Sequence, residues 1–187
     1  MAETSRTIVR TGVAQFFGGT TYDEKFRAYR NGPLMSYGLS TVRAYQPKRM
    51  PDMDYVLGQN PGRGMGAVMV LEMNETRDTP ITVGQKPATL NGQRGLVYPL
   101  QCHVFHMAHM PYAEDAEADV DELDQALHEQ MYSDPTLGGI CYQAGMDSLG
   151  IRSLIDQPEV WSPSDGGGEV LITHFRLMFD AQVQIVV

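Results

Sequence analysis

The sequence has few of the features that hold a small scaffold together or fix it to a membrane. It contains two cysteines in 187 residues, Cys102 and Cys141, without CxxC spacing, so neither a disulfide framework nor a zinc motif is expected. Both lie in apolar, strand-like segments, and we expect them to be buried and reduced. No apolar run reaches the ~18 residues of a membrane span, and residues 1–10 lack the apolar stretch of a signal peptide.

Basic residues are scarce in the second half of the chain. The whole sequence carries 14 Lys and Arg against 23 Asp and Glu, a formal net charge of -9. Residues 1–94 hold 12 basic and 8 acidic side chains, whereas residues 95–187 hold 2 and 15. An acidic chain is a poor non-specific ligand for nucleic acid, which is bound through its phosphates. The asymmetry indicates either head-to-tail pairing of copies through opposite charges or, more simply, one acidic helix that skews the count.

The clearest predicted element is an amphipathic helix over residues 113–132. Its first turn carries acidic side chains, which complement the helix dipole. Its apolar residues recur every three or four positions and form one stripe, which must pack against a sheet. The stripe consists of Ala116, Val120, Leu123, Leu127 and Met131.

Strands are predicted on both sides of this helix. Alternating or continuous apolar patterns indicate strands at 39–46, 67–73, 95–109, 140–155 and 171–187. The segment 140–155 contains a glycine bend, and the last strand is so long that a bulge is expected. Pro99 lacks an amide donor, which places it at a sheet edge or just before the strand begins. Residues 22–30 are predicted to form a short helix, and 47–66 and 74–93 to form long connections.

These elements predict an α+β fold. We expect a mixed, mostly antiparallel sheet packed against one main amphipathic helix, 113–132, with long loops. Hydrophobic residues make up 42% of the chain, which suits one globular domain with its own core. Residues 1–36 are expected to be an N-terminal extension or arm, and residues 37–187 the single domain.

No constellation of residues supports catalysis strongly. On a strand, His103 and His109 share a face but stand ~20 Å apart, and His106 points the other way, so no metal site is expected. The carboxylates of the predicted helix lie mostly off its apolar stripe, which indicates a solvated face. The glycine-rich stretch 58–66 lacks the Lys-Ser or Lys-Thr of a phosphate loop, and no GxSxG motif is present. We expect no enzyme, no cofactor and no metal; the alternative is a small metal-dependent enzyme built on His103 and His109.

The order of segments in the second half resembles the tail terminator and related minor tail proteins of long-tailed bacteriophages. The resemblance rests on an acidic helix (Asp119–Leu127), then the motif DPTLGG (Asp134–Gly139), then a strand, a variable loop and a closing apolar strand (Leu171–Val187). It covers residues 95–187, and extends loosely to the strands at 39–46 and 67–73.

The resemblance implies a structural virion protein with no catalysis. Such a subunit forms a homohexameric ring that caps the tail tube, ends tube polymerisation and joins the tail to the head connector. Its partners would be itself, the tail tube protein and the head-closure protein, with DNA passing through the lumen without specific binding and no membrane contact. It would be located in the virion tail or neck after assembly in the bacterial cytoplasm. The alternative in the same context is another neck or tail protein, such as a head-closure or tail tube subunit.

The predicted interface elements are the 47–66 loop, the 74–93 connection and the acidic helix with its following turn. The side chains assigned to the interface are Tyr55, Asn60, Arg63, Met65, Glu114, Asp115, Asp119, Glu122, Asp134 and Leu137.

Overall fold

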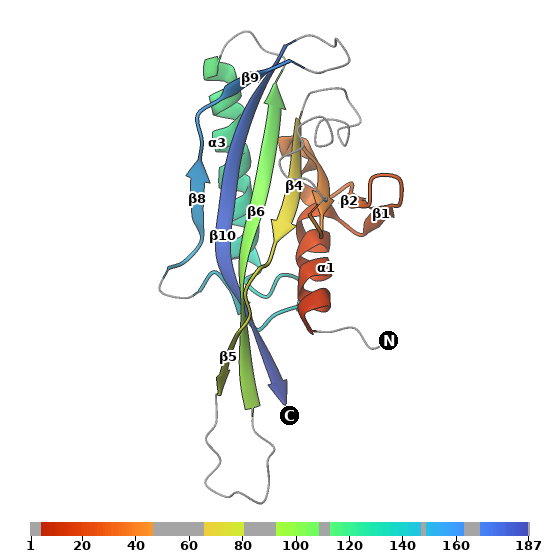
Figure 1. The fold of residues 1–187 in the computed structure, drawn as a ribbon, viewed down its shortest axis with the longest axis vertical. Helices are drawn as coiled ribbons and strands as arrows, with labels where there is room; N and C mark the ends of the chain where they lie inside the picture. The colour runs from red at the N-terminus through yellow and green to blue at the C-terminus, as the bar shows by residue number, and fades with distance from the viewer. Residues whose placement is uncertain are drawn as a thin grey trace, which may run out of the picture.

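The described part of the chain folds into one mixed sheet with α-helices against it (Figure 1). The computed structural model describes residues 5–46, 66–80, 93–108, 113–146, 149–162 and 169–186. In chain order the elements are α1 (Ser5–Gly18), β1 (Thr21–Asp23), β2 (Ala28–Arg30), the 3-10 helix η1 (Pro33–Tyr37), β3 (Leu39–Arg43), β4 (Gly66–Glu72), β5 (Arg77–Pro80), β6 (Gln93–Ala108), α3 (Ala113–Ser133), β7 (Gln143–Ala144), β8 (Arg152–Ile155), β9 (Glu159–Trp161) and β10 (Val170–Val186). The predicted α+β class is confirmed.

Two long antiparallel strands, β6 and β10, form the centre of the sheet. Their register runs without interruption from Leu171 opposite Ala108 to Val186 opposite Gln93. The bulge expected in the closing strand is therefore absent from its pairing with β6. Strict alternation on both strands places one set of side chains against the helices and the other set on the opposite face.

Shorter strands extend the sheet on either side of this central pair. On the outer side of β6, β4 and β5 pair with successive parts of the strand. From β4 the sheet continues through β3 and β2 to β1. The outer side of β10 carries β9, β8 and β7 in succession. Pairing is antiparallel except between β3 and β4, so the sheet is mixed and mostly antiparallel in the described residues.

Pro99 lies where β6 changes partners. Glu72, the last residue of β4, pairs with Gln101, and β5 begins pairing at Arg77 opposite Val97. No described strand pairs with Pro99 on that side, so its missing amide costs no ladder hydrogen bond. The expectation that Pro99 lies at a local edge is confirmed.

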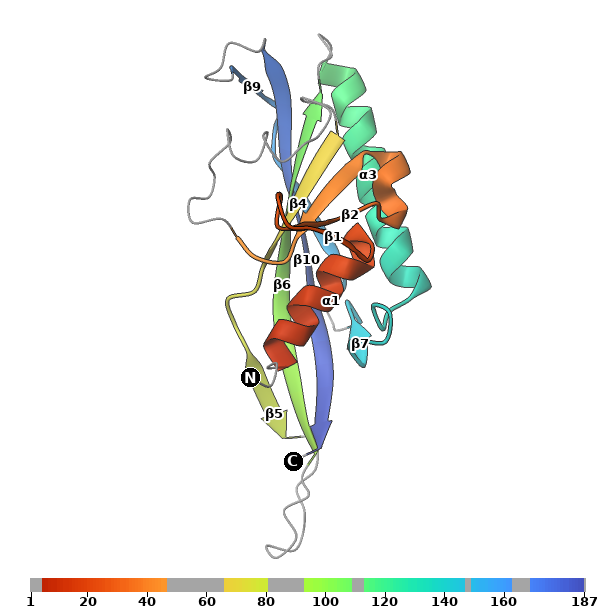
Figure 2. The same ribbon diagram turned by 90° about the vertical axis from the view of Figure 1, so that its right-hand side faces the viewer.

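The helix predicted at 113–132 is confirmed as α3, which lies on one face of the sheet (Figure 2). Its apolar stripe is buried over its whole length, and the acidic side chains of its first turn, Glu114 and Asp115, are exposed. The stripe packs into the same core as the side chains of β6 and β10 that point toward it.

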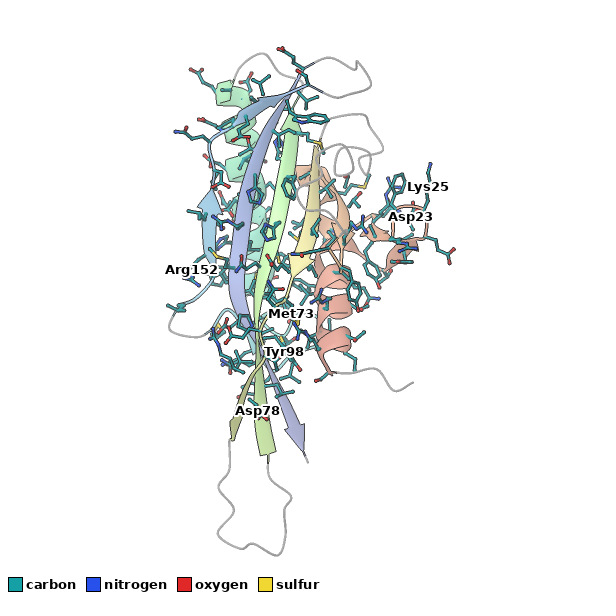
Figure 3. All side chains as sticks on the ribbon, viewed as in Figure 1. Asp23, Lys25, Met73, Asp78, Tyr98 and Arg152 are labelled. Atoms are coloured by element: carbon teal, nitrogen blue, oxygen red, sulfur yellow. The ribbon has the colours of Figure 1, made fainter. Side chains whose placement is uncertain are left out.

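The N-terminal segment is part of the core and not an arm. Helix α1 buries Val9, Val13, Ala14 and Phe17 in the same cluster as α3 and the central strands. Its start is also fixed by polar contacts, because the Ser5 and Tyr98 hydroxyls are 2.6 Å apart and Arg10 and Arg6 donate to the Met73 carbonyl (Figure 3). The fold therefore has two helices against its sheet, and the expectation of one main helix is corrected.

The segment 22–30 forms a β-hairpin, so the predicted short helix is wrong. The Asp23 carboxylate accepts from the backbone amides of Lys25 and Phe26 and from the Arg30 side chain. An aspartate that caps its own following amides begins a turn as readily as a helix, so the backbone of the next residues decides between them. Arg27 has a positive φ of 49°, which a helix would not tolerate.

The single strand predicted at 140–155 needs correction, and parts of the predicted connections lie outside the described residues. The segment 140–155 is two short strands, β7 and β8, because Gly145 and Gly150 both have φ of +63° and break the strand between them. Residues 47–65 and 81–92 of the two predicted connections lie outside the described residues. Among those that are described, no helix is long and apolar enough to span a membrane.

The lower ends of β5, β6 and β10 extend beyond both helices as a narrow ribbon (Figure 1). On β10, the last described pairs with β7 are at Ala181 and Gln182. Beyond them, the strand pairs only with β6 among the described residues. As far as the described residues go, one edge of this ribbon is unpaired and could pair with another chain.

The burial of α1 predicts that this helix is essential for stability. Replacing the fully buried Phe17 with alanine (Phe17→Ala) should lower the free energy of unfolding by about 3–5 kcal/mol, as truncation of a core aromatic does. Urea denaturation would measure this change. The matched control is Ile8→Ala on the same helix, where the side chain is 47% exposed and a change within about 0.5 kcal/mol is expected. Equal, small effects at both positions would contradict the packing of α1.

Candidate functional site

A pocket of about 870 Å³ lies on the face of the sheet opposite the helices. Its floor comes from β4, β6 and β10, and its rim from the segment between Asp156 and Trp161. The volume falls within the roughly 300–1,000 Å³ of ordinary ligand pockets. Apolar side chains such as Phe105 and Ile172 line it together with two histidines and three carboxylates. Acidic, imidazole and apolar groups thus meet on this surface.

Four side chains in this pocket form a continuous hydrogen-bonded chain. Glu72 Oε2 lies 2.6 Å from His103 Nε2, and His103 Nδ1 lies 3.1 Å from His174 Nε2. The other ring nitrogen, His174 Nδ1, lies 2.7 Å from Asp156 Oδ2. The order is therefore carboxylate, imidazole, imidazole, carboxylate. It joins β4, β6 and β10 to the segment after β8.

The two imidazole rings meet end to end. Their planes are within 9° of each other, and their centroids are 5.4 Å apart although the facing nitrogens are only 3.1 Å apart. The distance between the ring centroids is thus longer than the distance between the nitrogens by about one ring radius for each ring. The two nitrogens therefore point at each other nearly in one line, in the geometry of an N–H···N hydrogen bond.

Counting protons shows how the pair can be charged. Both terminal nitrogens face carboxylates and need an N–H, and the central contact needs one more, so three N–H groups satisfy all three contacts. Two rings with three protons carry one positive charge. A fourth proton would place two N–H groups head to head. The pair therefore accommodates one extra proton and resists a second.

The pKa values of the network reflect burial and these contacts. Burial lowers the pKa of His174; the hydrogen bond to Asp156 opposes that shift, and the nearby His103 and Arg176 add to it. Burial acts to raise the pKa of Glu72, but hydrogen bonds from His103, Asn74 and Gln46 outweigh it, and the pKa is lowered. Glu72 is thus held ionised. The network thus sets two carboxyl groups against an imidazole pair that accommodates one extra proton.

This geometry fits a shared proton better than a metal ion. A zinc ion bound to two imidazoles needs Zn–N distances of ~2.0–2.1 Å and lone pairs that converge on it at an angle. The nitrogens of His103 and His174 instead face each other in line, too close for an ion between them. No group of three His, Cys, Asp or Glu side chains converges on one point among the described residues.

Of the other two histidines in the run 103–109, one lies where the strand pattern placed it and one lies outside the described residues. His106 faces the helices, opposite to His103, as predicted. It is only 4% exposed, and burial lowers its pKa while Asp119 opposes the shift. The position of His109, the second residue of the alternative metal site, lies outside the described residues.

The residues assigned to an interface are dispersed over the chain. Tyr55, Asn60, Arg63 and Met65 lie outside the described residues. Four acidic side chains are exposed on α3: Glu114, Asp115, Asp119 and Glu122.

Asp134 and Leu137 build the turn of the DPTLGG motif. Asp134 accepts from the Thr136 amide and hydroxyl and from the Gly138 amide, contacts that lower its pKa. Leu137 is fully buried, and it and the next two glycines have positive φ values. The turn is therefore fixed by its own capping bonds and by one buried anchor.

The expectation for the cysteines is confirmed. Cys102 and Cys141 are both buried and unpaired. Burial raises the pKa of the Cys102 thiol far above its usual range and that of Cys141 to about 11, so neither is an activated nucleophile.

The four-residue chain itself was not predicted from the sequence. His103 was singled out, but Glu72, Asp156 and His174 were not, although His174 alternates onto the polar face of the closing strand. Which residue it would meet depends on the register of β6 and β10. His174 is opposite Phe105 and so lies diagonal to His103, a relationship that no single-strand pattern contains.

The histidines predict how stability depends on pH. Burial lowers the pKa of His174 and His106 below the 6.5 of a free side chain, so the unfolded chain binds protons first as the pH falls. Stability should therefore decline as the pH drops below about 6.5. Asp156→Asn should lower the pKa of His174 further, because it removes the contact that raises it. NMR titration of the imidazole carbons would measure this, with Asp121→Asn on α3 as the control. An unchanged His174 pKa would contradict the hydrogen bond.

Neither of two comparisons with known proteins identifies a relative. A scan against models of protein families matches none of them, and a search of curated proteins finds no significant match. The function must therefore be inferred from the fold and from the surfaces that the structure presents.

Proposed function

We propose that this chain is a structural protein of a bacteriophage tail, a tail terminator-like subunit that forms a ring and caps the tail tube. One observation carries the proposal: large apolar side chains are exposed at two opposite edges of the sheet. The segment order of acidic helix, DPTLGG turn and closing strand supports it further.

One of these edges is formed by the segments around β7, β8 and β9. Its exposed apolar side chains are Tyr142, Met146, Leu149, Leu154, Ile155 and Val160, each 42–65% exposed. Single exposed apolar residues are normal on any protein surface. Six of them between positions 142 and 160 favour a surface that another protein covers.

The second edge lies at the other end of the strand order, near β1. Tyr22 on β1 is 51% exposed there. Met35 and Tyr37 on η1, and Tyr45 after β3, are each 40–58% exposed as well. Because β1 and β7–β9 are at opposite ends of the sheet, two copies that join through them meet head to tail. Such heterologous contacts close into a ring when the rotation between copies allows it.

The remaining features are consistent with a place at the end of a tube. The ribbon of β5, β6 and β10 projects from the body and has one edge that is unpaired among the described residues, which suits pairing with a neighbouring tube protein. The exposed acidic face of α3 does not attract phosphates, so DNA would pass without being held. In this proposal the partners are further copies of the chain, the tail tube protein and the head-closure protein.

The purified protein is expected to assemble into closed rings, most simply hexamers. Native mass spectrometry would give the number of subunits, and negative-stain electron microscopy would give the shape. Long tubes in place of rings would favour the alternative of a tail tube subunit. A strictly monomeric chain that also fails to bind tail tubes would contradict the proposal.

The alternative of a metal-dependent enzyme makes a different prediction. Because the nitrogens of His103 and His174 face each other in line, metal analysis of the purified protein should find far less than one bound ion per chain. His103→Ala should leave that content unchanged. Stoichiometric zinc that is lost in His103→Ala would instead support the enzyme.

A further inference from the structure

We infer that the pocket around Glu72 and Asp156 receives the tip of the β1–β2 hairpin from a second copy of the chain. The Arg27 guanidinium would enter between Asp156 and Glu159. This inference rests on the proposed function, because it names the contact through which neighbouring subunits of a ring meet. The ligand of the pocket is then a guanidinium cation that another copy of the same chain supplies.

The pocket has an excess of negative charge at its open side. Glu72 and Asp156 are bound to the histidine pair, which accommodates only one extra proton; Arg176 lies beside His174, and the positive charge of Arg10 acts on Glu72. Glu159 on β9 adds a third carboxylate to the lining. With the imidazole pair neutral, the three carboxylates exceed the two arginines by one negative charge, and the most exposed of these carboxylates are Asp156 and Glu159. A cation therefore complements the site.

The shape of the pocket suits a guanidinium in particular. Asp156 directs Oδ2 to His174 and still exposes 46% of its side chain. Trp161, which is only partly buried, lines the same space. Carboxylates bind a guanidinium through paired hydrogen bonds, and aromatic faces attract its planar charge. An arginine from a partner would satisfy both kinds of group at once.

The β1–β2 hairpin presents such a cation on an ordered tip. Asp23 caps the amides of Lys25 and Phe26 and forms an ion pair with Arg30 at 2.9 Å. The Arg30 guanidinium also lies 4.8 Å from the centroid of the Phe26 ring. Lys25 and Arg27 remain exposed together with Glu24, so these three side chains carry one net positive charge. A tip already fixed by its own contacts loses little conformational freedom on binding.

Arg27 is held in an uncommon backbone conformation. Its φ of 49° lies in the left-handed region, which residues other than glycine, asparagine and aspartate seldom adopt. Strained residues often lie at binding sites, where the strain positions a side chain. This position makes Arg27, rather than Lys25, the residue that we place in the pocket.

The hairpin and the pocket rim lie at opposite edges of the subunit. Figure 3 places Lys25 on one side of the molecule and Arg152, on β8, on the other. The strand order gives the same result, with β1 at one end of the sheet and β7–β9 on the outer side of β10. One copy can thus donate its hairpin to a neighbour and receive another hairpin in its own pocket. Exposed Tyr22 beside the tip and Val160 beside the rim would shield the charges from water.

Charge reversal tests this contact. Arg27→Glu and Glu159→Arg should each raise the protein concentration needed for half-assembly by about tenfold or more, as the loss of an interfacial charge pair does. Assembly would be followed by native mass spectrometry and analytical ultracentrifugation. The matched controls are Lys25→Glu, an exposed lysine on the same hairpin that is not placed in the pocket, and Glu129→Arg, an exposed glutamate on α3 that is not among the side chains assigned to the interface. Both controls should assemble like the unmodified chain, and thermal melts should show all four variants folded.

Mixing the two reversed variants provides the decisive result. In an alternating ring, the hairpin of the Arg27→Glu variant enters the pocket of the Glu159→Arg variant, so the two introduced charges are again opposite in sign. The remaining contacts pair an unmodified Arg27 with an unmodified Glu159, and a one-to-one mixture should therefore assemble again. Weakened assembly that mixing does not restore would overturn this contact, as would reversals without effect. If the unmodified chain still formed rings in either case, only this contact would be contradicted, and the proposed function would remain supported. An unmodified chain that never leaves the monomeric state would overturn both.

Discussion

The pairing of β6 with β10 is the interaction on which the rest of the structure depends. Its uninterrupted register runs from Leu171 and Ala108 to Val186 and Gln93. It directs Phe175 and Leu177 toward the helices, and His103 and His174 toward the other face, where they meet. The same two strands carry β4 and β5 on one side and β9, β8 and β7 on the other. Core, pocket and projecting ribbon therefore follow from one set of backbone hydrogen bonds.

Periodicity alone was enough to predict the elements whose apolar pattern is long. The helix at 113–132 and the alternation along 95–109 belong to this group, because burial of one face leaves a repeat in the sequence. The hairpin at 22–30 was mistaken for a helix, since its shape depends on the Asp23 side chain and on the positive φ of Arg27. Helix α1 was mistaken for an arm because what it packs against, including Val42 and Leu137, is far away in the sequence.

The candidate site was less predictable than the fold for a physical reason. A site built across strands requires the register between them, and β4, β6 and β10 come from three separate parts of the sequence. The pattern of one strand assigned His103 to a face of the sheet. It could not show that Glu72 and His174 would contact His103 there. The charge asymmetry of the sequence was visible at once. The structure shows where some of these charged side chains lie. Lys25 and Arg27 are at the hairpin tip on one edge, and the carboxylates Asp156 and Glu159 are at the other edge.

The place of β10 in the chain has a consequence for how the protein is made. This strand follows every other described element in the sequence, yet it lies between β6 and the strands β7–β9. During synthesis, more than sixty residues between Ala108 and Val170 are added after β6 before its partner strand β10 is made. Pairings of such sequence separation form slowly, and unpaired apolar strands are prone to aggregation in the meantime. Helix α3, which can form locally as soon as it is synthesised, is placed to shelter β6 during that interval.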